Sequence, residues 1–169
     1  MHIGLLLPRA LAAASSRELV AWARAAEDAG FDGLGVRGRI VHDSLEPLVA
    51  LSLVAASTRR IELVLHLPAL HLTQPRILAR QIGGLDRASR GRLNVAVCGW
   101  TFTDRDGLPR RLSVVDCPAT SGAVLDGVRE VLDDYERAGA DDVLLEVPSM
   151  TTRDLERLAA VRTALTVVA

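Results

Sequence analysis

Short apolar runs alternate with amphipathic stretches along most of the chain. Residues 2–7, 34–36, 61–67, 93–97 and 142–147 are largely apolar and branched, as expected of strands that are covered on both faces. Most of the stretches between them repeat apolar residues every three or four positions, which is typical of helices that pack one face on a sheet. The pattern predicts right-handed strand–helix–strand units in a parallel sheet.

One phrase occurs twice, as ARAAEDAGFDGLGV from residue 23 and as YERAGADDVLLEV from residue 135. In both copies a helix ends in Ala-Gly, an acidic residue follows, and an apolar run begins at once. Glycine reaches the positive φ that closes a helix, so Gly30 and Gly139 are predicted helix stops. The phrase is therefore a repeated helix-to-strand junction.

Three helix starts carry recognisable signals. Ser15 and Asp43 are each followed three residues later by a glutamate, which predicts two capping boxes. Pro75 stands at the first position of a helix that runs to about residue 89. Further elements are predicted as helices at 124–137 and 152–165 and as a terminal apolar run at 166–168.

The region from Trp100 to Ser121 breaks the alternation. It is polar and contains Gly and Pro, with only residues 112–115 as a candidate short strand. About six parallel strands, with one doubtful, are fewer than the eight of a (β/α) barrel. We therefore expect an α/β fold: a shortened or incomplete TIM-type barrel, formed by a single domain over residues 1–169 with an irregular connection at about 100–121.

Composition narrows the class of partner. The chain has 169 residues, 49% of them hydrophobic and 3% aromatic, and a formal net charge of -1. This charge offers no general attraction to nucleic acid, and no apolar run approaches the roughly 20 residues of a membrane span. Two cysteines do not make a disulfide framework, and the N-terminal apolar stretch is too short for a signal peptide. We expect a cytoplasmic protein that binds neither nucleic acid nor membrane.

Four segments resemble one protein family. ELVAWARAAEDAGFDGLGV, LEPLVALSLVAASTRRIELV and QPRILARQIGGLDRASRGRLNVAVCGW lie within the first hundred residues, and VLDGVREVLDDYERAGADDVLLEVP lies near the end. Together they resemble the bacterial luciferase-like family of flavin- and deazaflavin-dependent oxidoreductases, in a shortened form that lacks the middle of the barrel. The resemblance implies a luciferase-like oxidoreductase or monooxygenase that uses reduced flavin or deazaflavin, as FMN or coenzyme F420, on a small organic substrate.

Polar side chains gather at the predicted carboxyl ends of the strands, where parallel α/β proteins carry their sites. These residues are Arg9, Arg37, Arg39, His42, His66, His71, Cys98, Trp100 and Glu146. A guanidinium pairs well with an anionic group, so Arg37 or Arg39 suits an anionic ligand. His42 or His66 suits proton transfer near neutral pH. The competing interpretation is that the arginines face solvent or pair with nearby carboxylates, and that the histidines cap loops.

The resemblance assigns roles to five of these residues. His42 and His66 become catalytic candidates, and Arg37, Arg39 and Trp100 become cofactor-binding candidates. Arg39 stands where family members commonly have a histidine. No metal site is predicted, because the histidines and Cys98 match no compact metal motif.

A second function stays open. The chain could be a cofactor-free barrel remnant that acts as a small-anion binder, an acid/base enzyme or a structural partner. The partner that we expect is a small-molecule substrate, and an anionic one would suit the arginines.

We also predict a homodimer. An open sheet would leave strand edges, and the helix in EPLVALSLVAAS is apolar nearly all round. Against this, the segment from Trp100 to Ser121 could close a smaller barrel by itself, with Leu112, Val114 and Val115 in the place of the missing strands.

Overall fold

The structure is a computed structural model of the whole chain. It describes residues 1–7, 15–37, 45–67, 74–97, 100–102, 110–116 and 123–146, and in the last stretch residues 156, 159, 160, 162 and 163. Within these ranges, strands and helices alternate through the first half, as the apolar pattern predicts.

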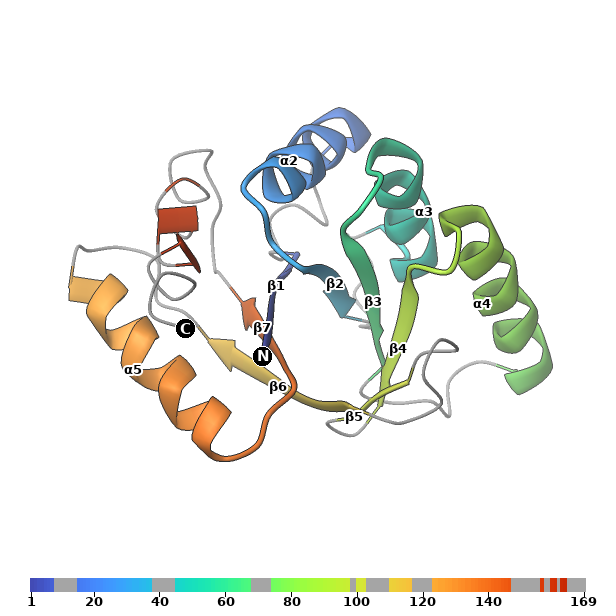
Figure 1. Cartoon of the computed structure of the whole chain (residues 1–169). Helices are drawn as coiled ribbons and strands as arrows, with labels where there is room; N and C mark the ends of the chain where they lie inside the picture. Colours follow the sequence, from blue (N-terminus) through green and yellow to red (C-terminus); the bar gives the residue numbers. More distant parts are fainter. Residues whose placement is uncertain are drawn as a thin grey trace.

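Figure 1 shows the helices arranged around the outside of the strands. The elements are β1 (His2–Leu6), α2 (Ser16–Asp28), β2 (Gly33–Arg37), α3 (Pro47–Ser57), β3 (Glu62–His66), α4 (Pro75–Ser89), β4 (Leu93–Val97), β5 (Trp100–Phe102), β6 (Arg110–Asp116), α5 (Ala123–Arg137) and β7 (Asp142–Glu146).

The seven strands pair in a closed ring in the order in which they occur along the chain. Six of them run parallel, and the short β5 is antiparallel to both of its neighbours, β4 and β6. The fold is therefore a shortened TIM-type barrel with six parallel strands, as expected. The alternative in which the segment after Trp100 closes the barrel is also confirmed, because β5 and β6 join β4 to β7.

Two apolar cores lie on the two faces of the ring. The larger core lies between the helices and the strands, where α2 contributes Leu19, Trp22, Ala23 and Ala26 at helical spacing. The smaller core is built from residues on the other face of the strands, inside the ring: Leu6, Val64, Ala96, Leu112, Leu144 and Val114. The strands are thus covered on both faces, which explains their nearly continuous apolar sequence.

The local helix signals hold with one correction. Ser15 and Glu18 form the predicted capping box, with the Ser15 Oγ 3.4 Å from the Glu18 amide nitrogen. Helix α3 instead begins after Glu46, whose carboxylate accepts a hydrogen bond from the Val49 N–H at 3.1 Å. Asp43, the predicted cap, lies outside the described residues.

Both glycines of the repeated junction have the predicted positive φ, 84° at Gly30 and 80° at Gly139. Helix α4 ends differently, because Arg90 takes the left-handed conformation at φ 64°. The predicted elements at 152–165 and 166–168 fall largely or wholly outside the described residues.

A buried arginine ties α3 to the start of β4. Arg92 is 8% exposed, and its guanidinium donates to the carbonyl oxygens of Ala55 and Ile61, each at 2.9 Å, and to the Thr58 hydroxyl at 3.0 Å. The carbonyl groups at a helix C-terminus lack intrahelical partners, so this charge satisfies groups that water cannot reach.

Candidate functional site at the carboxyl ends of the strands

Among the side chains that the structure describes, alternation along the strands places three charged or titratable groups inside the ring at its carboxyl end. Arg37, His66 and Glu146 each stand two residues after an inward-facing position, namely Gly35, Val64 and Leu144. The register agrees, because Arg37 pairs with His66 and Leu6 pairs with Glu146.

Arg37 and Glu146 form an ion pair over the end of β1. The Arg37 Nη1 lies 2.9 Å from the Glu146 Oε2, and the two side chains are 21% and 10% exposed. Their strands, β2 and β7, are separated in the ring by β1. The pair therefore lies against the inner face of the ring rather than on the outer surface. The apolar pattern predicts Glu146 at a strand end but no role for it there, because its partner is distant in the chain.

His66 is half-buried beside this ion pair. Burial lowers the pKa of His66 below its ordinary value of 6.5, and the positive charge of Arg37 lowers it further. The neutral imidazole is therefore favoured near neutral pH. A neutral imidazole can accept a proton, so His66 stays a candidate for the predicted acid/base role.

Two buried nitrogen atoms at this end of the ring have no hydrogen-bond partner within the described part of the chain: the Arg37 Nε and the His66 Nδ1. Buried polar atoms are nearly always satisfied in folded proteins. Their position at the carboxyl end of a parallel barrel makes both atoms candidates for binding a ligand.

The middle of the ring is filled. A Cβ on Gly4 would lie 2.6 Å from the Leu144 Cδ2, and one on Gly35 would lie 2.8 Å from the Leu144 Cδ1. Leu144 thus occupies the space above both glycines, and the barrel interior forms a packed layer below the charged groups. Within the described part of the chain, this layer blocks the approach from the amino-terminal end, so a ligand would reach Arg37 and His66 from the carboxyl end.

The other predicted site residues are placed in part. Arg39 and His42 lie outside the described residues. Trp100 begins β5, and its backbone pairs with Val97 at the end of β4. The structure thus brings together Arg37 and His66 of the five candidates. Among the described residues, no group of three or more His, Cys, Asp or Glu side chains is arranged to hold a metal ion.

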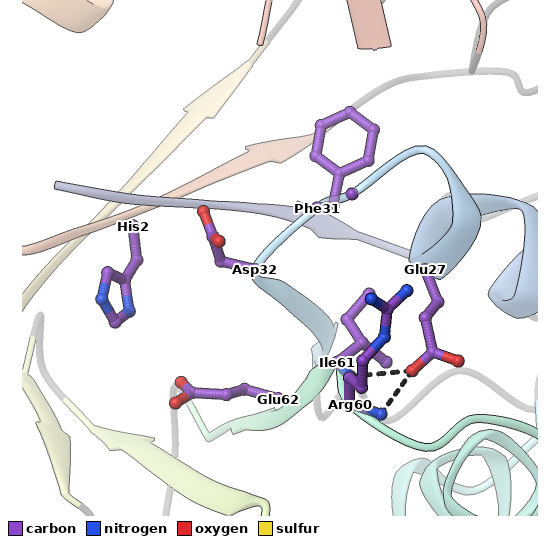
Figure 2. A pocket seen from close by; sticks show the side chains of 8 residues that line it. His2, Glu27, Phe31, Asp32, Arg60, Ile61 and Glu62 are labelled. Atoms are coloured by element: carbon purple, nitrogen blue, oxygen red, sulfur yellow. Dashed lines mark hydrogen bonds between the residues drawn. The ribbon is translucent and has the colours of Figure 1, made fainter. Parts of the chain in front are cut away.

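A pocket of about 300 Å³ lies near the opposite, amino-terminal end of the strands. Figure 2 shows Asp32, Glu62 and His2 on one side of it and Glu27 on the other. These carboxylates already serve the fold. Glu27 accepts hydrogen bonds from the backbone N–H groups of residues 59–61 at 2.6–3.1 Å, and Asp32 lies 2.9 Å from Arg162.

Burial alone would raise the pKa of Glu27, but the three backbone donors outweigh it and lower the pKa. We interpret this hydrogen-bond network as part of the fold rather than of a binding site, since the amino-terminal face of a parallel barrel mainly supports stability. The carboxyl end therefore carries the candidate site.

Comparison with known proteins shows which family and which folds the chain resembles. The family model described as luciferase-like monooxygenase matches residues 1–113. Within the described ranges, no helix combines the length and apolar character that spanning a membrane requires. No curated protein matches the chain.

Among solved structures, the monooxygenase RslO1 from Streptomyces bottropensis shares 28% identity with a TM-score of 0.50, over 57% of this chain and 32% of that one. The coenzyme F420 dependent tetrahydromethanopterin reductase from Methanopyrus kandleri shares 19% identity with a TM-score of 0.51, over 75% of this chain and 29% of that one. The second likeness shows the fold alone. The aligned regions span about a third of the length of these two structures.

Proposed function

The chain belongs to the luciferase-like monooxygenase family, and on that premise we propose that it is an oxidoreductase or monooxygenase that uses a reduced flavin or deazaflavin, FMN or coenzyme F420, on a small organic substrate. The observation that carries the proposal is the grouping of Arg37, His66 and Glu146 at the carboxyl end of a barrel that matches the family.

The donor set fits such a cofactor. A flavin or deazaflavin ring presents carbonyl oxygens and ring nitrogens along one edge, and the buried Arg37 Nε–H is a donor that needs an acceptor. The cofactor would supply the hydride or electrons for the reaction. Arg37 would hold the ring edge, while Arg39 and Trp100 remain proposed contacts that border or cover the ring.

His66 would move the proton. The Cα atoms of His66 and Arg37 are register partners on adjacent strands. The lowered pKa of His66 keeps its imidazole neutral and able to accept a proton near pH 7. His42 remains the second proposed acid/base residue. Glu146 would keep the Arg37 guanidinium in place through the 2.9 Å ion pair, so that the charge beside His66 is fixed.

The experiment is a titration of the purified protein with FMN and with coenzyme F420, followed by visible absorbance and by fluorescence quenching. We expect saturable binding in the micromolar range with one of them, and weaker binding in Arg37→Gln. Arg24→Gln is the matched control, because Arg24 lies on α2 and its Nε already donates to the Ser57 carbonyl at 3.2 Å. The absence of a saturable change with either cofactor would remove the proposal.

A second candidate is a cofactor-free barrel that binds a small anion, performs acid/base chemistry or serves as a structural partner. It is supported by the extent of the match, because the aligned region covers only 32% of RslO1. The same titration separates the two candidates.

We further propose a cytoplasmic homodimer. The strand-edge argument for a dimer does not apply to a closed ring. The helix argument remains, because Val49 on α3 is 50% exposed and borders a groove of about 420 Å³ between α3 and α4.

A further inference from the structure

The Arg37 guanidinium has one side engaged and another without a partner. Its Nη1 lies 2.9 Å from Glu146, whereas the Nε–H points away from Nη1 and has no acceptor in the described part of the chain. In an arginine, the Nε–H and one Nη N–H lie parallel along one edge, and this edge matches the two oxygens of a carboxylate. The available edge of Arg37 is thus built for a planar oxyanion.

His66 adds a second group at the same level. His66 lies on β3, which pairs with β2, the strand of Arg37. The two Cα atoms are register partners on strands that lie about 4.8 Å apart. The His66 Nδ1 is buried and also lacks a partner within the described residues. Two polar atoms on adjacent strands, both on the inner face, can therefore contact one small group.

The charges around His66 determine what that group must be. Arg37 faces it from β2, Glu146 lies beyond Arg37 on β7, and its register partner on β4 is the uncharged Ala96. Among the described side chains, the nearest charge is thus positive, and it disfavours protonation of the imidazole. An anion placed between Arg37 and His66 would be attracted by the first and would favour protonation of the second.

We propose that Arg37 and His66 together bind one planar oxyanion of the ligand, with the Arg37 Nε edge donating to it and His66 taking up a proton as it binds. This rests on the site of the proposed function and specifies its ligand chemistry. The oxyanion belongs either to a carboxylate on the substrate or to the anionic edge of the reduced cofactor ring.

The test uses sodium benzoate as the probe, in isothermal titration of the full chain at a pH near 6.5 in two buffers with different heats of ionisation. The difference between the two apparent enthalpies gives the number of protons taken up. We expect saturable binding with a positive, fractional proton uptake, and uptake near zero in His66→Gln.

Arg37→Lys tests the edge, because lysine keeps the positive charge opposite Glu146 but has no planar pair of donors. Its benzoate affinity should fall about tenfold or more, whereas Arg24→Lys on the outer face of α2 should bind as the parent does. Proton uptake is measured on the unaltered protein, so the proposal stays testable if Arg37→Lys fails to fold. Benzoate binding without proton uptake, or unchanged affinity in a folded Arg37→Lys, would overturn it.

Repeating the benzoate titration with FMN or coenzyme F420 present identifies the source of the oxyanion. Simultaneous binding assigns it to the substrate, and mutual exclusion assigns it to the cofactor. If benzoate binds with these properties and neither cofactor binds at all, the proposed function fails and this inference stands. If a cofactor binds but benzoate shows no saturable binding, the inference fails and the proposed function stands.

Discussion

Arg37 and Glu146 are joined by an ion pair of 2.9 Å although β1 runs between their two strands. The pair links the second strand of the ring to the seventh on its inner face. It therefore depends on ring closure, and it holds a guanidinium beside the half-buried His66. The same contact serves stability and the proposed chemistry.

Removing one partner of this pair should destabilise the protein. Glu146→Gln leaves the mostly buried Arg37 without its counter-charge, and we expect a loss of about 2–3 kcal/mol in the free energy of unfolding, less than for a fully buried pair because Arg37 is partly solvated. Arg37→Met should cost a similar amount. Urea unfolding of the double variant should show a loss smaller than the sum of the two single losses. Additive losses would mean that the two side chains do not interact in solution.

The stability should fall at mildly acidic pH because of His66. Its folded pKa lies below the ordinary value of 6.5, so between these two pKa values the unfolded chain binds more protons than the folded one. The stability is fully present above about pH 6.5 and is lost as the pH falls through the folded pKa. Urea unfolding across this range should show a slope that His66→Gln reduces.

Arg37 contributes to this shift as the smaller of its two causes, after burial. In Arg37→Gln, the pKa of His66 measured from its imidazole resonances by NMR should therefore rise but stay below 6.5. An unchanged pKa of His66 would mean that the charge of Arg37 does not act on the imidazole, and it would count against a shared ligand.

Much of the barrel follows from local sequence, because buried strands and capped helices are determined by neighbouring residues. The capping box at Ser15 and the positive φ of Gly30 and Gly139 are examples. Strand β5 has only three residues, which is too short to show the alternation of apolar and polar residues that identifies a strand, and it runs antiparallel to its neighbours. Strand β6 was predicted only as a doubtful run, and its place between β5 and β7 depends on tertiary pairing.

The site was predictable only by position. Arg37 and His66 could be identified as candidates because they end apolar runs, and parallel strands end at the same side of a sheet. The role of Glu146 required the ring, which brings the first and last described strands together. An acidic residue that directly follows the apolar run at residues 143–145 was the available signal, since a buried carboxylate there needs a cation.

The packing of Leu144 predicts a graded response to added methyl groups. Gly4→Ala would bring a Cβ to 2.7 Å from the Gly33 carbonyl oxygen as well as onto Leu144, so we expect a loss of about 2–3 kcal/mol. Gly35→Ala meets only the side-chain ends of Leu144 and Leu6 within 3.0 Å, and Leu144→Val should partly rescue it. The same second change should not rescue Gly4→Ala, whose clash includes backbone. Gly33→Ala, with its nearest neighbour at 3.7 Å, is the control for urea unfolding.

Arg92 should matter more to stability than its neighbours on the surface. Arg92→Met would leave the carbonyl groups of Ala55 and Ile61 and the Thr58 hydroxyl without this donor in the interior, at a cost of about 2–4 kcal/mol. Thermal unfolding followed by circular dichroism measures the loss. A loss no greater than that of Arg59→Met, at an exposed position, would show that these groups find other partners.

The proposed dimer can be tested at Val49. Leu51 is fully buried, so a glutamate there would unfold the subunit and could not report on an interface. Val49 is half-exposed beside the groove between α3 and α4, and Gly84 on the facing helix has open space above it. We expect light scattering to give a dimer mass for the parent and a monomer mass for a folded Val49→Glu, because the carboxylate would be buried without a partner in the interface. Val131→Glu, on α5 at 36% exposure, should remain dimeric. A monomeric parent at tens of micromolar would remove the dimer, while a dimer that survives Val49→Glu would move the interface away from α3.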